Sequence, residues 1–199
     1  MDDFFDRPEA IIHVAHSRSC HALYNWWVRT RGPDLIPRRD GLIPRQLGGL
    51  LPWMFILGKS TDGASHSPDI WRFAGSAAEH VFQHCMQNKP FLDFWSQDDR
   101  ILVKDLATAC REEMRPFAVR FSSADQDETP AGLFDLMALP IIAQSGYRVH
   151  HIGILVPVML WAENIGGKLH TGKVLDITML EDMPEFHERT MRASRTARA

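Results

Sequence analysis

Five stretches of the chain alternate hydrophobic and polar residues, a pattern typical of strands that are buried on one face. In the last of them, Ile152, Ile154 and Val156 lie on the same side of the predicted strand. Short turns connect several neighbours, so these strands are expected to pair antiparallel in one sheet. The predicted strands cover residues 53–58, 70–75, 117–122, 133–142 and 147–158.

Between the second and third predicted strands, apolar residues recur every three or four positions, which predicts two helices. Ser76 begins the first helix, and Ser96 begins the second, whose apolar stripe includes Val103 and Leu106. A further helix begins at Asp6, which can cap it, and runs to about residue 30. The order of elements predicts an α+β fold: a five-stranded antiparallel sheet with helices packed on one face, plus an N-terminal helix.

The N-terminal helix has an apolar face near its end. Leu23 and Trp27 lie one helical turn apart, and Tyr24 lies beside them. The glycine and proline at positions 32 and 33 stop the helix, because glycine supplies a left-handed cap and proline cannot continue it. A large apolar face on an exposed helix usually marks an interface. Leu23, Tyr24 and Trp27 are therefore predicted to form the interface of a homodimer.

Composition and charge narrow the range of partners. The 199 residues have a hydrophobic content of 45% and a formal charge of −3, whereas a nucleic-acid-binding domain needs a clearly basic face. No uncharged apolar run approaches the roughly 18 residues of a membrane span. Cys20, Cys85 and Cys110 share no metal-binding or redox spacing and indicate reduced, mostly buried thiols. We therefore expect a cytoplasmic protein with no nucleic-acid partner and no membrane span.

Several short motifs follow one another in a specific order along residues 20–158. They are LYNWWVRTRG (23–32), LIPRRDGLIP (35–44), LLPWMFIL (50–57), WRFAGS (71–76), FLDFW (91–95), LMALPI (136–141) and HHIGILVP (150–157). In this order the chain resembles a family of small bacterial PAS-like proteins. Asp135 stands where that family has an acidic residue, and the long polar turn at 60–69 departs from the family pattern. The resemblance implies a PAS-like domain over 21–158, an N-terminal helical extension over 1–20 and a C-terminal extension with a basic tail over 159–199.

The resemblance also implies where a ligand would bind. Trp71, Phe73, Phe94 and Trp95 are predicted to line the space between the sheet and the middle helices, where a PAS-type fold often keeps a ligand cavity. Core packing alone would also explain these four aromatic side chains. Arg72 points to the opposite side of its strand, where it forms a structural ion pair, lies on an exposed face of the sheet, or contacts an anion or a partner. The prediction is a sensory and protein-interaction domain of bacterial signal transduction, which binds a small ligand or a partner protein without catalysis.

An alternative function is a small enzyme that uses a metal ion or a small molecule. His80 and His84 are four residues apart on a predicted helix, with Cys85 adjacent, and this spacing allows two imidazoles to bind one metal ion. The zinc-protease pattern HExxH is absent, and so are a nucleophile elbow and a glycine-rich phosphate loop. Chance explains such a pair in a chain with ten histidines. We therefore predict no catalytic residue, no metal site and no cofactor.

Overall fold

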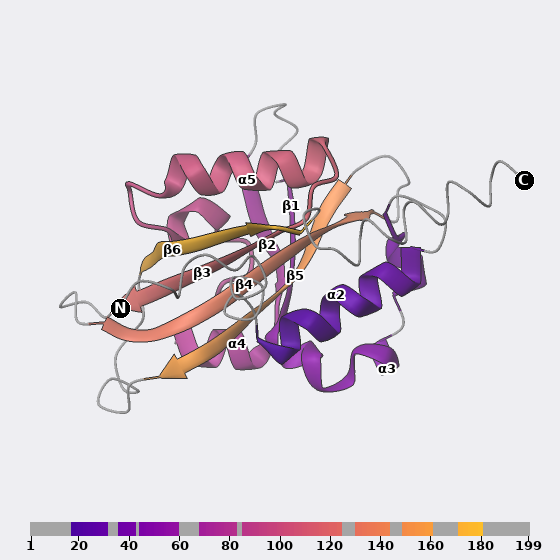
Figure 1. Ribbon diagram of the computed structural model, residues 1–199, viewed down its shortest axis with the longest axis horizontal. Coiled ribbons are helices and arrows are strands. Elements are labelled where there is room, and N and C mark those ends of the chain that lie inside the picture. Colours follow the sequence, from indigo (N-terminus) through magenta and orange to yellow (C-terminus); the bar gives the residue numbers. More distant parts are fainter. Residues whose placement is uncertain are drawn as a thin grey trace, which may run out of the picture.

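One antiparallel sheet forms the centre of the protein (Figure 1). The computed structural model describes residues 17–31, 36–42, 44–59, 68–82, 85–124, 130–143, 149–160 and 171–180. The strands are β1 (Met54–Lys59), β2 (Asp69–Ala74), β3 (Phe117–Ala124), β4 (Pro130–Ile142), β5 (Val149–Leu160) and β6 (Thr171–Met179). They lie in the order β2-β1-β5-β4-β3-β6, and every neighbouring pair is antiparallel. The predicted α+β fold with a single antiparallel sheet is confirmed.

Helices cover both faces of this sheet. One face, called the inner face below, packs against α4 (Ser76–Phe82), the 3-10 helix η3 (Phe91–Phe94) and α5 (Arg100–Glu112). The opposite, outer face packs against α2 (Arg18–Arg31), beside which lie α3 (Pro44–Leu47) and the 3-10 helices η1 (Arg39–Gly41) and η2 (Gly48–Trp53). The middle helices therefore share one face, as predicted, and the N-terminal helix covers the other. No helix in the described part of the chain has the length and apolar composition to cross a membrane.

Alternation along the strands divides the buried side chains into two hydrophobic cores. On β4, Leu136 and Ala138 belong to the inner core, whereas Met137 and Leu139 belong to the outer core. A strand that is buried on both faces is hydrophobic at nearly every position, and β4 has this character. The sheet is therefore one layer of backbone shared by two cores.

The sheet has six strands rather than the predicted five, because strand β6 was not recognised in the sequence. It pairs along β3 at the edge of the sheet, with a register shift between Arg120 and Phe121. The shift makes Leu175 an extra residue in β6, so Val174 and Ile177, which both pack on the inner core, are three positions apart. The bulge therefore breaks the two-residue alternation by which the other strands were recognised.

The prediction that Trp71 and Phe73 share the buried face of β2 is wrong for Phe73. Trp71 is buried in the inner core, but the side chain of Phe73 is 42% exposed. Leu57 of β1 pairs with Trp71, whereas Ile56 pairs with Phe73, so Arg72 is an extra residue. Such a bulge shifts the following residue to the other face of the sheet.

The apolar face of α2 is covered by the protein itself. Leu23, Tyr24 and Trp27 are all buried in the outer core, and the indole nitrogen of Trp27 donates a hydrogen bond to the carbonyl oxygen of Pro140 at 2.8 Å. The expectation that these three residues form an exposed apolar face is therefore wrong, because the outer face of the sheet already covers them. Residues 6–16 of the predicted N-terminal helix lie outside the described residues.

Candidate functional site

The aromatic residues predicted to line the space between sheet and middle helices come together there, with the exception of Phe73. The ring centroids of Trp71 and Phe94 are 6.0 Å apart, and those of Phe94 and Trp95 are 5.3 Å apart. All three rings are buried, mostly in edge-to-face contacts. The three rings belong to a larger group of buried rings in contact with one another, called the inner aromatic cluster below: Trp71, Phe82, Phe91, Phe94, Trp95, Phe121 and Phe134. The region predicted to hold a ligand is thus packed with the protein's own rings.

One end of the inner aromatic cluster contains two buried polar groups that lack a hydrogen-bond partner among the described residues. They are the indole nitrogen of Trp95 and the hydroxyl of Ser123. Gly172 of β6 pairs with Ser123 and bridges to Trp95, so the three residues are neighbours. A Cβ at position 172 would lie 3.0 to 3.1 Å from the rings of Phe94, Phe121 and Trp95. Because buried polar groups are nearly always paired, these two are available to a polar ligand atom.

Arg72 forms a hydrogen bond within the sheet, and its predicted contact with a ligand stays a prediction. One of its terminal nitrogens donates a hydrogen bond to the carbonyl oxygen of Lys59 at 2.6 Å. This bond joins the end of β1 to the bulged residue of β2. Neither Arg72 nor Phe73 belongs to the inner aromatic cluster, so the structure does not bring together all five predicted ligand-binding residues.

Polar contacts hold α5 on the inner face of the sheet. The Nε2 atom of His151 lies 2.9 Å from the carbonyl oxygen of Ala107, and Arg111 contacts the carboxylate of Asp69 at 2.6 Å. Burial lowers the pKa of His151 from 6.5 to about 4, against an opposing effect of Asp69. Burial likewise raises the pKa of the Cys110 thiol, so this cysteine is an inert core residue.

A buried ion pair anchors the start of α2 on the outer face. Asp135 of β4 is fully buried and accepts two hydrogen bonds from Arg120, at 2.9 and 3.1 Å. Its carboxylate also accepts a bond from the backbone nitrogen of Ser17 at 2.7 Å, immediately before α2. The Ser17 hydroxyl in turn accepts a bond from the backbone nitrogen of Cys20, as an N-cap residue does. Burial raises the pKa of the Cys20 thiol to about 12, so it too is unreactive.

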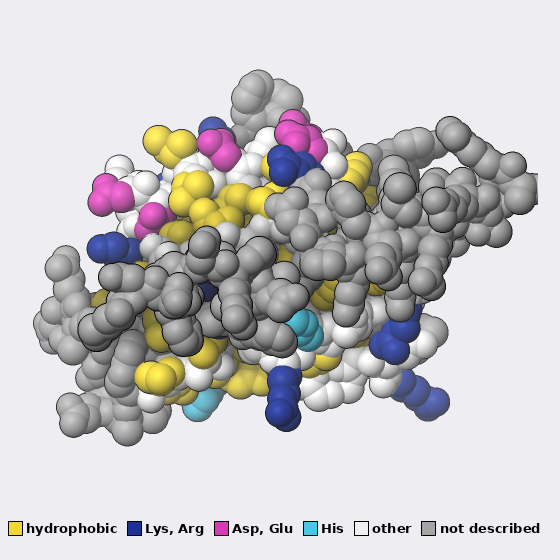
Figure 2. Space-filling view, in the orientation of Figure 1, with side chains coloured by type: hydrophobic (Ala, Val, Ile, Leu, Met, Phe, Trp, Pro, Cys, Tyr) yellow, Lys and Arg dark blue, Asp and Glu magenta, His cyan; other side chains and the backbone are white. Residues whose placement is uncertain are grey.

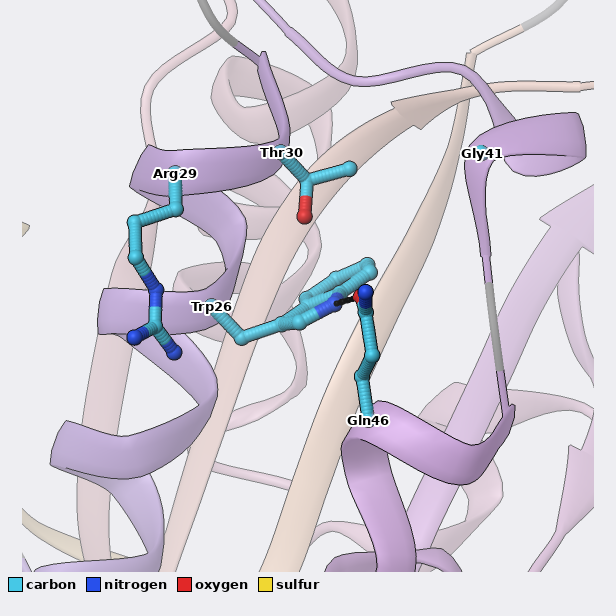
Figure 3. Close-up of a pocket in the computed structure, with 5 residues that line it drawn as sticks. All are labelled: Trp26, Arg29, Thr30, Gly41 and Gln46. Carbon is cyan, nitrogen blue, oxygen red and sulfur yellow. Dashed lines mark hydrogen bonds between the residues drawn. The ribbon is translucent and has the colours of Figure 1, made fainter.

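A groove that the sequence did not predict lies between α2 and α3 (Figure 3). Its volume is about 640 Å³, and an adjoining hollow of about 430 Å³ shares Trp26, Arg29 and Gln46 with it. The ring of Trp26 lies between the two helices, and its indole nitrogen donates a hydrogen bond to the side-chain oxygen of Gln46 at 3.3 Å. Thr30 and Gly41 complete the wall of the larger hollow. The only signal in the sequence was the number of arginines in residues 29–45.

The structure describes only one of the two histidines of the alternative metal site. His80 is exposed on α4, and His84 lies outside the described residues. Within the described ranges, no group of three or more histidine, cysteine or acidic side chains is placed to hold a metal ion.

Comparison with known proteins identifies the family. A family model described as "PAS domain" matches residues 15–156, which is well over half of the chain. The chain belongs to the PAS domain family. The resemblance drawn from the sequence motifs is thereby confirmed, and the matched residues of this PAS domain run from just before α2 to near the end of β5.

Solved structures similar to this PAS domain share little sequence with it. A PAS domain of a protein from Colwellia psychrerythraea is 14% identical, with a TM-score of 0.40 over 59% of this chain and 98% of that chain. A structure titled "Flavin Analogue Sheds Light on Light-Oxygen-Voltage Domain Mechanism" is 12% identical, with a TM-score of 0.43 over 58% of this chain and 83% of that one. An RNA-binding light-oxygen-voltage receptor is 15% identical, with a TM-score of 0.41 over 60% of this chain and 34% of the receptor. No curated protein matches the sequence.

Proposed function

We propose that this PAS domain is a signalling module without catalytic activity, in which a small ligand or a partner protein changes the packing of α2 on the sheet. One observation carries the proposal: β4 is shared by the two cores. Leu136 and Ala138 belong to the inner core, and Met137 and Leu139 to the core that α2 covers. Because protein interiors are close-packed, a shift of β4 that relieves one core disturbs the other.

A chain of direct contacts links the inner aromatic cluster to the start of α2. Phe82 of α4 lies 5.0 Å from Phe134 between ring centroids, and Phe134 is stacked on Phe121 at 5.4 Å. The next residue of β4 is Asp135, whose carboxylate accepts the hydrogen bond from Ser17. A movement of the Phe134 ring therefore acts on the backbone that positions Asp135 and, through it, the first turn of α2.

The unpaired polar groups of Trp95 and Ser123 support a small polar ligand at one end of the inner aromatic cluster. Such a ligand gains two hydrogen bonds in a buried site, where an unpaired polar group is costly. The rings already fill this region, so the ligand enters only if they move. That movement is the change in packing that we propose is transmitted to α2.

Hydrogen exchange of the full chain tests this coupling. Phe94→Leu loosens the inner aromatic cluster, and Phe73→Leu is the matched control because Phe73 lies outside it and is 42% exposed. We expect Phe94→Leu, but not Phe73→Leu, to speed the exchange of α2 amides several-fold. Amides in the centre of β5 report global unfolding, so the acceleration in α2 must exceed the acceleration that Phe94→Leu causes in those β5 amides.

Two results would overturn the proposed function. If Phe94→Leu speeds exchange in α4 and η3 while α2 is unaffected, the sheet does not couple the two cores. Phe82→Leu repeats the test should Phe94→Leu fail to fold. If stoichiometric zinc or iron co-purifies with the protein and is lost in the His80→Ala, His84→Ala double variant, the protein binds a metal ion through these histidines and the proposed function is wrong.

A further inference from the structure

The surface formed by α2, α3 and η1 is basic, although the whole chain has a formal charge of −3. Asp40 is the one acidic residue among the described residues from 17 to 53, and it pairs with Arg38 at 3.4 Å. On the visible face, acidic side chains gather in the upper half around α5, whereas the region of α2 and α3 at the lower right shows lysine or arginine (Figure 2). The arginines of this surface are Arg18, Arg29, Arg31, Arg38, Arg39 and Arg45.

Two of these arginines, Arg29 and Arg45, line the groove between α2 and α3, and Arg18 lies on the same face of α2 as Arg29. Arg18 and Arg29 are spaced three helical turns apart, on the face of α2 that contributes Ala22 and Asn25 to the groove. Arg45 reaches the groove from α3. All three arginines are exposed, and none of them has an ion-pair partner among the described residues.

Gly49, at the other side of the groove, is not required by the fold. A Cβ at this position would meet no atom within 4 Å, and its backbone, unlike that of Gly48, does not have a left-handed φ. Glycine costs conformational entropy wherever neither φ nor packing demands it. The bare backbone at Gly49, beside Arg45 and Gln46, leaves room for a group outside the chain to approach closely.

We propose that this groove binds an acidic segment of a partner protein, with carboxylates on Arg29 and Arg45 and the backbone of the segment against Gly49. The inference rests on the proposed function, because it names the surface by which the signalling domain meets its partner. Arginine forks suit carboxylates, and arginine and tryptophan are enriched at the centres of protein interfaces. Binding here would contact α2 directly, the helix whose packing carries the signal.

The groove suits a protein segment better than other anions. Small-molecule sites are enclosed, whereas this groove lies open at the surface and carries the charged side chains of Arg29 and Arg45. Single-stranded nucleic acid stacks its bases on exposed aromatic rings, but Trp26 is only 3% exposed and forms the floor of the groove.

Selection from a displayed library of random 15-residue peptides against the full chain tests the proposal. We expect enriched peptides with clustered Asp and Glu, whose affinity falls about fivefold in Arg29→Gln and in Arg45→Gln, the effect of one exposed ion pair. Gly49→Ala should weaken the same peptides while its Tm stays equal or rises, since alanine is compatible with this backbone. Lys104→Gln on the exposed side of α5 is the matched control and should leave the affinity unchanged.

Several outcomes would overturn the proposal. Enriched peptides without an acidic bias, or acidic peptides that bind the arginine variants as well as the wild type, would remove the groove as their site. A fluorescein-labelled 15-nucleotide RNA bound through Arg29 and Arg45 would assign the groove to nucleic acid. A dimer in sedimentation that Arg29→Gln dissociates would assign it to a second copy of the chain. The hydrogen-exchange test of α2 does not use the peptides. The two experiments can therefore reject peptide binding in the groove and the proposed signalling function independently of each other.

Discussion

Replacing Asp135 by asparagine should lower the free energy of unfolding by about 3 kcal/mol. The variant keeps the size of the side chain but removes its charge from a fully buried pair with two bonds to Arg120 and one to Ser17. Breaking such a pair by removing one partner costs roughly 3–5 kcal/mol, because the other charge stays buried. We expect the lower end, since the side chain of Arg120 is 18% exposed and Asp176 of β6 lies opposite it as a second carboxylate.

Urea unfolding followed by circular dichroism measures this loss, and hydrogen exchange locates it. The exposed pair of Arg38 and Asp40 is the control, and Asp40→Asn should cost less than about 0.5 kcal/mol because exposed pairs contribute little. Relative to the wild type, Asp135→Asn should speed the exchange of amides in the first turn of α2 more than the exchange of α5 amides. A double variant, Arg120→Met with Asp135→Leu, should be less destabilised than Asp135→Asn, because no unpaired charge remains. If Asp135→Asn costs no more than Asp40→Asn, the ion pair does not anchor α2.

Two further predictions concern the inner face of the sheet. The low pKa of His151, about 4 in the folded protein against 6.5, means that the unfolded chain binds more protons between these values. The free energy of unfolding should therefore fall by about 3 kcal/mol as the pH drops from 6.5 to 4. The Tm of His151→Gln, measured over the same pH range, should fall less than the Tm of the wild type. Equal slopes for the two proteins would contradict this prediction. Gly153→Ala places a Cβ 2.3 Å from the carbonyl oxygen of Met137 and 2.1 Å from the ring of Phe55. It should cost several kcal/mol or prevent folding, and urea unfolding within 1 kcal/mol of the wild type would refute the close packing of β4 and β5.

The alternation of side chains was sufficient to find the elements whose buried faces are regular. Strands β1 to β5 and helix α5 lie within a few residues of their predicted positions, and Ile152, Ile154 and Val156 are all buried on one face, as predicted. Helix α5 and the regular parts of these strands bury side chains at their natural periods, so local sequence carries the information there. The motif order was likewise sufficient to identify the PAS family.

Where a bulge interrupts the alternation, only the pairing of strands decides which side chains are buried. The burial of Phe73 and the existence of β6 were predicted wrongly for the same reason. An extra residue at Arg72 and another at Leu175 shift the side chains that follow them to the opposite face of the sheet. A bulge depends on the partner strand, and a single strand's sequence does not record it. The sequence therefore predicted five strands, and the sixth emerged only from its pairing with β3.

Burial of an apolar helix face and assembly of a surface site are also decided in three dimensions. The sequence determined that Leu23, Tyr24 and Trp27 form an apolar face of α2, but only the tertiary structure showed that the outer face of the sheet covers it. Arg29 and Arg45 are 16 positions apart in the sequence, and they line one groove because α3 packs beside α2. Local sequence thus determined the helices, the regular strands and the family, while long-range packing decided which faces are buried and which charges lie side by side.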